Sequence, residues 1–313
     1  MIQLQDEALL EDLLAAIHAT FGHHTGYRAT HSKGIVAHGT FTAAPEAARL
    51  SRAAHLQGQP VPVTVRFSNF SGVPQTPDGD MMASPRGLGI RFHAGEGAGT
   101  DIVAHSFDGF PVATPREFLA FLQGIAASVS PTAPDPAPLE TFLASHPRAR
   151  HYLETVKPPP RSYTTIHYFG INAFVLAAAD GTLSTGRYRF EPLAPPETVP
   201  EHEVPTLAEN YLADELEARL AQGPAAMRLI FQLAGNGDDT ADGSQPWPYY
   251  GPQARHEQVL GELQIEALAS DQVQASSQLA LNPARLIDGV QLSDDPMVPL
   301  RNALYRLAAS RRR

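Results

Sequence analysis

Five arginines of this chain lie inside strand-like or helix-like segments, where a charged side chain is unexpected unless it is exposed to solvent or paired with an anion. They are Arg28, Arg66, Arg86, Arg189 and Arg301. Arg66 is the clearest case, because VPVTVRFS (61–68) has the period-2 pattern of a strand and carries the arginine within it. A buried guanidinium is costly unless an anion meets it, and its fork of donors fits a carboxylate. The pattern therefore indicates an anion site or a surface arginine on a half-exposed strand, and both remain open.

The histidines could supply acid–base or metal chemistry, but their spacing matches no zinc motif. The chain has 13 histidines, and none lies in an H-E-x-x-H arrangement. His23 and His24 are more typical of a loop pair than of a ligand pair, while His31 and His105 occur singly. A G-x-S-x-G elbow for serine-based hydrolysis is also missing. The residues alone thus indicate embedded charges without a defined reaction.

Short strand-like runs, separated by Gly, Pro or polar turns, must position these side chains. One group covers 34–42, 61–68, 86–93 and 100–106, and a second covers 163–177, 182–193, 226–235 and 258–268. Helices are expected at 1–20, 44–56, 116–128 and after Pro299, with a Pro-rich break at 130–147. This order predicts an α+β fold, a closed antiparallel eight-stranded β-barrel with inserted and C-terminal helices. The inside of such a barrel is filled by side chains or holds one small ligand.

Composition limits the function classes. The 313 residues are 43% hydrophobic and contain no cysteine, which excludes disulfides, thiolate nucleophiles, iron–sulfur centres and a thiolate-ligated haem. The formal net charge of −10 argues against nucleic acid as a partner. The N-terminal segment has no basic start and no uninterrupted apolar run, and no stretch approaches the roughly 20 apolar residues of a membrane span. We therefore expect no membrane contact and a cytoplasmic location.

Four motifs follow one another along the chain. They are Arg28-x-x-His31-Ser32-Lys33-Gly34, Val65-Arg66-Phe67-Ser68, Pro85-Arg86-Gly87 and Arg301-x-x-x-Tyr305. In this order the set resembles the haem catalase family, whose chains carry R-x-x-H-A-K-G, V-R-F-S, D-P-R-G and a terminal R-x-x-x-Y. The segments SDDPM (293–297) and LNPARL (281–286) add to the resemblance. We expect one catalase-like domain over 1–313, with an N-terminal helix at 1–22, a core at 25–305 and a tail at 306–313.

The resemblance implies haem b as the cofactor, with Tyr305 as the protein ligand of its ferric iron. Tyr305 would bind as the phenolate, since the metal's charge depresses the pKa of a phenol. Arg301 lies one helical turn away on the same face and would hydrogen-bond that phenolate.

The resemblance also implies the residues that hold the rest of the cofactor. Arg28 and Arg66 would pair with the haem propionates, and Arg312 falls where the family places another propionate arginine. The aromatic positions that pack on the haem or line its pocket correspond to Phe110, Phe118 and Phe121.

On the distal side the resemblance assigns His31 as the acid–base that takes a proton from peroxide and returns it to the departing oxygen. Ser68 would hydrogen-bond this histidine and fix its tautomer. Two positions depart from the family pattern. His105 stands where the family has a distal asparagine, and Thr30 replaces the valine that narrows the main channel.

These features imply a small catalase-related peroxidase that reduces hydrogen peroxide or organic hydroperoxides with a small organic electron donor, with weak catalase activity allowed. Only eight residues follow Tyr305, so we expect a more exposed haem edge than in full catalases and a monomer or homodimer. The alternatives are a minimal true catalase, an enzyme that rearranges fatty-acid hydroperoxides, and a non-enzymatic haem-binding protein. His105 favours the last alternative, whereas His31, Ser68 and Arg301 argue against it.

Overall fold

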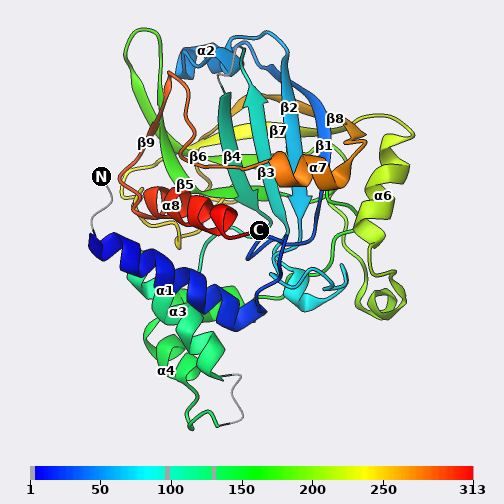
Figure 1. Cartoon of the computed structure of the whole chain (residues 1–313). Helices are drawn as coiled ribbons and strands as arrows, with labels where there is room; N and C mark the ends of the chain where they lie inside the picture. Colours follow the sequence, from blue (N-terminus) through cyan, green and yellow to red (C-terminus); the bar gives the residue numbers. More distant parts are fainter. Residues whose placement is uncertain (1–3, 96–98, 129–131, 313) are drawn as a thin grey trace.

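The computed structural model describes residues 4–95, 99–128 and 132–312 (Figure 1). Its strands are β1 Gly34–Ala43, β2 Val61–Ser68, β3 Gly87–His93, β4 Gly99–His105, β5 Tyr168–Ala177, β6 Leu183–Pro192, β7 Ala225–Leu233, β8 Glu257–Leu268 and β9 Val290–Leu292. Within the described residues these strands form one sheet in the order β4-β3-β2-β1-β8-β7-β6-β5-β9. Each of the eight long strands lies within a few residues of the segment expected from the sequence.

The sheet closes into a barrel where β4 meets β5. His105 of β4 pairs with Phe169 of β5, so the eight strands β1 to β8 form a ring, and β9 adds to the outer side of β5. Neighbouring strands run antiparallel around the ring. The predicted closed antiparallel eight-stranded barrel is therefore confirmed.

Side chains fill the interior of the barrel. The apolar residues of β2 at alternate positions, from Val61 to Phe67, are buried in this core together with Phe41, Phe92 and Phe231. The intervening positions of β2 are exposed or half-buried at Pro62 and Thr64. At Arg66 and Ser68 they become buried too. The outer face of the barrel is thus covered near the end of β2, and that cover forms the site described below.

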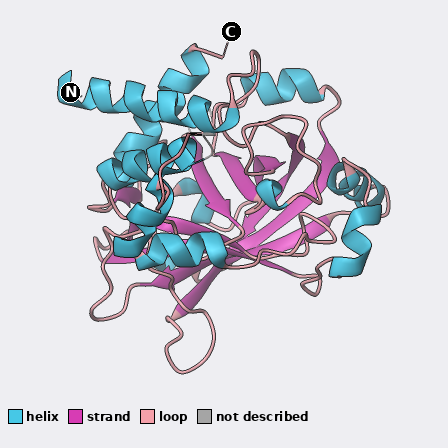
Figure 2. Cartoon of the chain, turned by 90° about the horizontal axis from the view of Figure 1, so that it is seen from below, coloured by secondary structure: helices cyan, strands magenta, loops and turns pink. Residues whose placement is uncertain are grey.

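Helices supply the cover (Figure 1). They are α1 Leu4–Phe21, α2 Ala47–Leu50, α3 Pro115–Ser128, α4 Pro138–Ser145, α5 Pro147–Glu154, α6 Tyr211–Leu220, α7 Gln272–Gln278 and α8 Met297–Ser310. Short 3-10 helices occur at η1 Ala54–Leu56, η2 Met81–Ala83 and η3 Glu201–Thr206. Helix α1 packs between α3 and α8, joined by an apolar cluster that includes Leu13, Leu122 and Leu304. Seen from below, most helices gather on one side of the strands (Figure 2).

Three local expectations were wrong, each for a reason seen in the backbone. The helix expected at 44–56 ends at Leu50, because Ser51 is extended (φ −151°, ψ 140°), and only a 3-10 turn follows. The Pro-rich stretch 130–147 is not irregular throughout: Pro138 and Pro147 begin α4 and α5, at the position where a missing N–H costs nothing. Helix α8 begins at Met297, before Pro299, because the first helical turn tolerates proline.

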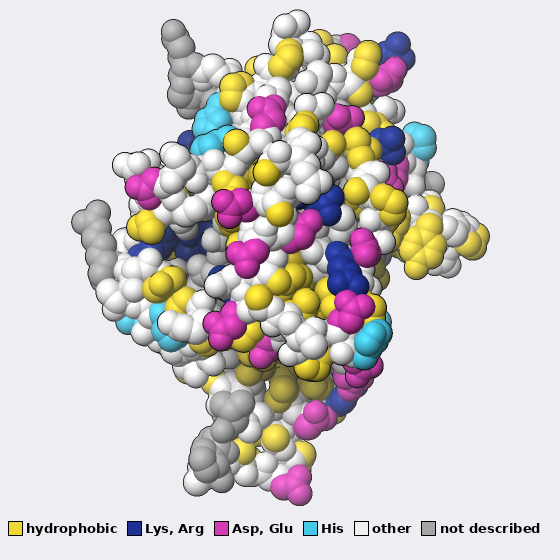
Figure 3. Space-filling view, turned by 90° about the vertical axis from the view of Figure 1, so that its right-hand side faces the viewer, with side chains coloured by type: hydrophobic (Ala, Val, Ile, Leu, Met, Phe, Trp, Pro, Cys, Tyr) yellow, Lys and Arg dark blue, Asp and Glu magenta, His cyan; other side chains and the backbone are white. Residues whose placement is uncertain are grey.

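The surface gives no sign of a membrane-spanning helix. Among the residues that the structure describes, none of the helices is both long enough and apolar enough to cross a bilayer. On the face shown in Figure 3, acidic and basic side chains lie interspersed among apolar ones.

Candidate active site

A cavity of about 300 Å³ lies on the outer face of the barrel, beneath α8. Strands β2, β3 and β4 form one wall, α8 and part of α1 form another, and the loop 279–285 completes it. The volume is in the range of small-molecule pockets. Arg66 and Ser68 reach this cavity because they point away from the barrel interior, opposite to Val65 and Phe67. The ligand space therefore lies outside the barrel, whose interior is packed.

Tyr305 and Arg301 face the cavity from α8. Arg301 Nη2 donates a hydrogen bond of 3.0 Å to Tyr305 Oη, as their i, i+4 spacing predicts. Arg301 Nη1 is held by Asn172 Oδ1, and Asn172 Nδ2 donates to Asp295 Oδ2 at 2.7 Å. This chain of contacts anchors Arg301 to β5, so the guanidinium is fixed beside the phenol oxygen.

Three arginines gather at the end of the cavity near the C-terminus. Arg28, Arg66 and Arg312 line it, and no acidic partner for any of them occurs among the described residues. Burial, together with the neighbouring charges of Arg66 and Arg312, lowers the pKa of Arg28 to about 8. Burial likewise lowers the pKa of Arg66 to about 10. These pKa shifts indicate that the three guanidinium groups lie close together and that no carboxylate among the described residues neutralises them.

The contacts of these arginines leave donors for a ligand. Arg28 is held by Ser276 Oγ at 2.9 Å and by the carbonyl oxygen of Leu279 at 2.7 Å. Arg66 uses only Nη2, which donates to the carbonyl oxygens of His31 and Ser32 at 2.9 and 3.3 Å. The Nε atoms of Arg66 and Arg312 are buried and have no hydrogen-bond partner in the described part of the chain.

His31 and Ser68 form a hydrogen-bonded pair on the barrel wall of the cavity. His31 Nδ1 lies 3.0 Å from Ser68 Oγ. Gly87 on the adjacent strand leaves the space for both: a Cβ there would lie 2.5 Å from Ser68 Oγ and 2.7 Å from His31 Nδ1. The motif P-R-G thus carries its glycine because the imidazole occupies the place of a side chain.

The backbone of His31 is held in an unusual conformation. Its φ is 53°, in the left-handed region that non-glycine residues rarely adopt, and the surrounding structure must stabilise it. The His31 N–H donates to the carbonyl oxygen of Phe70 at 2.9 Å, and its own carbonyl accepts from Arg66. The two bonds fix the direction in which the imidazole leaves the chain.

The imidazole of His31 is neutral over the physiological range. Burial, together with the positive charges of Arg66 and Arg301, lowers its pKa to about 3. A neutral imidazole that is hydrogen-bonded through Nδ1 keeps Nε2 free to accept or donate a proton.

His105 lies at the barrel seam and lines the same cavity. It pairs with Gly87 on one side and Phe169 on the other. Both ring nitrogens are buried, and neither has a hydrogen-bond partner among the described residues. Burial, together with the charge of Arg301, lowers the pKa of His105 to about 3. A buried imidazole with two unused nitrogens needs a ligand or water beside it.

The three phenylalanines expected near the haem pack in a neighbouring apolar cluster. Of the described residues, Phe110, Phe118 and Phe121 are not among those lining the cavity. They belong to an apolar cluster built with Val112 and helices α3 to α5, in which the rings of Phe110 and Phe118 are 5.2 Å apart. The cavity wall is aliphatic at Leu88 and Leu304. Contact of the three phenylalanines with a haem stays a prediction.

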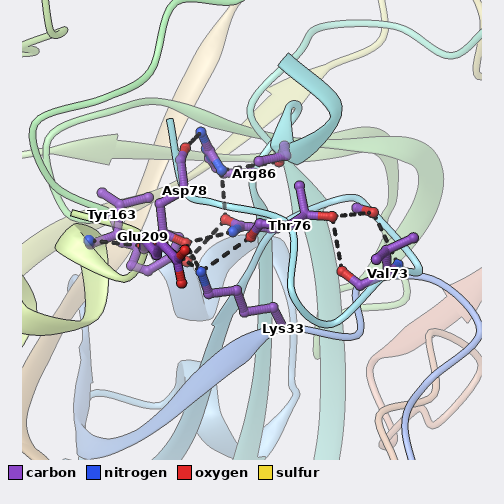
Figure 4. Close-up of polar contacts among 11 residues, drawn as sticks. Lys33, Val73, Thr76, Asp78, Arg86, Tyr163 and Glu209 are labelled. Atoms are coloured by element: carbon purple, nitrogen blue, oxygen red, sulfur yellow. Dashed lines mark hydrogen bonds and ion pairs between the residues drawn. The ribbon is translucent and has the colours of Figure 1, made fainter. Parts of the chain in front are cut away.

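A buried polar network supports the segment that carries Ser68 and Gly87 (Figure 4). Asp78, 1% exposed, accepts from Lys33 Nζ at 2.8 Å and from Asn69 Nδ2 at 2.7 Å. Arg86 Nη1 donates to Asn69 Oδ1 at 2.6 Å, and Arg86 Nη2 donates to the carbonyl oxygen of Asp78 at 2.6 Å. Asn69 follows Ser68 and Arg86 precedes Gly87. The network therefore fixes the position of the two residues, Ser68 and Gly87, that lie against the imidazole of His31.

Several residues of the site were missed by sequence reasoning. Lys33 and Arg86 stood in the motifs without an assigned task, and Asp295 stood in the segment SDDPM. Asn69, which directly follows V-R-F-S, and Asn172, an amide inside an otherwise apolar strand, are the signals that could have been used. Asp78 lies in a Pro/Gly-rich loop and gave no such signal.

Comparisons with known proteins show the family and the fold of the chain. A family model described as Catalase matches residues 1–313. A catalase-related peroxidase of Mycolicibacterium paratuberculosis is 34% identical over 94% of this chain and 92% of its own, and one of Synechococcus elongatus is 29% identical over 96% and 88%. The crystal structure of a fungal catalase superposes with a TM-score of 0.79 at 18% identity, over 92% of this chain and 59% of that chain, which shows the shared fold. This chain belongs to the catalase family.

Proposed function

We propose that this protein is a haem b-dependent peroxidase that reduces hydrogen peroxide or organic hydroperoxides with a small organic electron donor. One observation carries the proposal: a single cavity brings together the pair Arg301–Tyr305 and the pair His31–Ser68. The names of the two catalase-related peroxidases support the same reaction class.

The residues present fit a haem with two carboxylates. Arg28, Arg66 and Arg312 offer donors and positive charge that nothing in the described chain neutralises. Propionates would supply the missing anions through charge-assisted hydrogen bonds. Tyr305 offers a phenol oxygen to the same cavity, where Arg301 would stabilise it as the phenolate that ferric iron requires.

When bound, the haem iron would supply the two-electron chemistry that cleaves the O–O bond. The task of His31 is to move one proton between the two oxygens of the peroxide. Its Nε2 takes the proton from the oxygen that will stay and returns it to the oxygen that leaves as water or alcohol. With Nδ1–H donating to Ser68 Oγ, the contact of 3.0 Å would hold the tautomer in which Nε2 is the acceptor.

His105 would orient the peroxide. Because its pKa is far below neutral, it remains uncharged and offers one N–H donor and one acceptor near His31. The asparagine expected at this position would offer a donor and an acceptor as well, so the change keeps the capacity for hydrogen bonding. The cytoplasmic location and the monomer or dimer state stay predictions from the sequence.

The test is an absorption spectrum of the haem-reconstituted protein, followed by hydrogen peroxide with and without a phenolic donor. We expect a ferric spectrum with tyrosinate ligation, donor oxidation and little oxygen release. Tyr305→Phe should lose that spectrum, while Tyr250→Phe, whose ring is 74% exposed, should keep it. Vigorous oxygen release without a donor would make the protein a minimal catalase, and an unreactive spectrum would make it a haem-binding protein. Failure to bind haem would overturn the assignment.

A further inference from the structure

All charged side chains that line the cavity are arginines. They are Arg28, Arg66, Arg285, Arg301, Arg306 and Arg312. No aspartate or glutamate is among the described residues of the lining, although the whole chain has a formal net charge of −10 and its surface mixes both signs (Figure 3). A cleft lined by one sign of charge concentrates ligands of the opposite sign.

Four of the six arginines have a task in the proposed function, and two have none. Arg301 holds Tyr305, and the three-arginine group would meet two propionates. Arg285 and Arg306 remain, one in the loop before β9 and one on α8. Both are exposed while lining the cavity, which places them where it opens to solvent.

The guanidinium groups of these two residues have donors to spare. Arg306 has no ion pair or side-chain hydrogen bond within the described ranges. Arg285 Nε lies 3.5 Å from Asp101 Oδ2, but that carboxylate is already bound by Arg91 through two contacts of 2.8 Å. The Nη atoms of Arg285 therefore remain available. Leu281 and Leu304 provide apolar surface in the same lining.

We propose that the electron donor is a phenolic carboxylate, bound through its carboxylate by Arg285 and Arg306 at the mouth of the cavity. The proposal rests on the peroxidase function above and names the class of its donor. A carboxylate fits the planar guanidinium fork, and an aromatic ring fits the aliphatic surface beside it. Each turnover would convert one hydroperoxide and two phenols to one alcohol, one water and two phenoxyl radicals. Each phenol loses one electron and one proton.

The experiment compares 3-(4-hydroxyphenyl)propionate with its amide, which carries the same phenol without the charge. Binding to the ferric holoprotein without peroxide is measured by calorimetry, and kcat/KM is measured with peroxide. We expect the carboxylate to bind at least tenfold more tightly, and the preference to shrink between 0.05 and 0.5 M salt. In Arg285→Gln/Arg306→Gln the preference should fall about tenfold, with an unchanged haem spectrum. The control Arg49→Gln/Arg116→Gln removes the same charge from exposed positions outside the cavity lining and should keep it.

The outcomes separate the two proposals. Equal binding and equal kcat/KM for acid and amide, with both oxidised, would overturn the donor class and leave the peroxidase function standing. A preference that the control variant loses as fully as Arg285→Gln/Arg306→Gln would also overturn it, because net charge alone would then explain the effect. Tight binding of the acid without oxidation of either compound would support the anion site and count against the peroxidase function.

Discussion

The same substitution, arginine to methionine, should have different effects at two buried positions, one on β2 and one just before β3. At one position it should weaken haem binding, and at the other it should destabilise the fold. Arg66 on β2 and Arg86 just before β3 are 4% and 1% exposed. Arg66 lines the cavity with donors unused, whereas Arg86 is bound within the network around Asp78. We therefore expect Arg66→Met to impair haem binding with little effect on the apoprotein, and Arg86→Met to destabilise the fold.

The magnitude for Arg66 follows from two opposing contributions. Its pKa falls from 12.5 to about 10, so at pH 7 burial of the charged form costs the fold roughly 3 kcal/mol. A lowered pKa for a cation means that the charge destabilises the folded state, and methionine removes that cost. Against this, one atom, Nη2, donates to two carbonyl oxygens, and their loss costs about 2 kcal/mol. The free energy of unfolding of the apoprotein should change by no more than about 1 kcal/mol.

For haem affinity the two contributions do not cancel. A charge-assisted hydrogen bond to a propionate is worth about 1.5–3 kcal/mol, so Arg66→Met should weaken haem binding roughly 10- to 100-fold. Arg86→Met instead removes three hydrogen bonds. The carbonyl oxygen of Asp78 loses its donor, whereas Asn69 Oδ1 keeps Tyr163 Oη and the carbonyl oxygen of Ala83 keeps the Phe70 N–H. That loss should lower the free energy of unfolding by about 3–5 kcal/mol.

Urea unfolding of each apoprotein at pH 7 and titration with haem, followed by absorption, measure the two quantities separately. The reasoning is refuted if Arg66→Met loses 3 kcal/mol or more of apoprotein stability, because Arg66 would then be a structural clamp. Unchanged haem affinity in Arg66→Met would refute it equally, since the cavity would have no anion at that position.

Three further predictions concern histidines. Gly87→Ala places a Cβ 2.7 Å from His31 Nδ1 and should slow the reaction with peroxide at least tenfold, as measured by stopped-flow absorption. The control Gly235→Ala, whose Cβ meets nothing closer than 3.4 Å, should leave this rate unchanged. Burial lowers the pKa of His55 to about 4, so unfolding takes up a proton at this residue as the pH falls below 6.5. His55 alone should lower the free energy of unfolding by about 2 kcal/mol between pH 7.5 and 5, in addition to the losses from the buried His31 and His105. His55→Phe should therefore lose about 2 kcal/mol less than the wild type in urea titrations at both pH values. His105→Asn should keep the rate with peroxide within a few fold, whereas an equal rate in His105→Leu would show that no hydrogen bond from this position is used.

The barrel was predictable because strand patterning is local. Each of the eight strands is an apolar or alternating run that ends at Gly, Pro or a polar turn, and β2 matches the run VPVTVRFS from end to end. The closed antiparallel barrel followed from the number of strands and their grouping. The pairing order of the strands and the closure at His105 and Phe169 were not predicted and are seen only in the structure. The helices around the barrel were less predictable, because prolines at 138 and 147 read as breaks although they begin helices.

Residues at the cavity could be predicted where a sequence motif marks them. They could not be predicted where only the packing of the folded chain brings them to the site. The resemblance named Arg66, His31 and Tyr305, and the structure places all three at one cavity. Phe118 packs against Phe110, and its role toward a ligand stays a prediction, because an aromatic on a helix face has the same spacing whether it meets a ligand or another helix. Asp78 was missed because its partners lie in separate segments, such as Lys33, and only the folded chain brings them together.

The site lies at the end of β2, where an outward-facing side chain of the barrel wall is charged and yet buried. A wall strand with its inner face in the core should expose polar residues outward, as Thr64 does, yet Arg66 is buried under α8. Beside it, His31 holds a left-handed backbone through contacts with Arg66 and Phe70. Both features cost folding free energy in the apoprotein, and an anionic ligand that pairs with Arg66 would offset the cost of the buried charge. The ligand should therefore raise the free energy of unfolding by more in the wild type than in Arg66→Met, because the wild type has one more unpaired buried charge to neutralise than the variant.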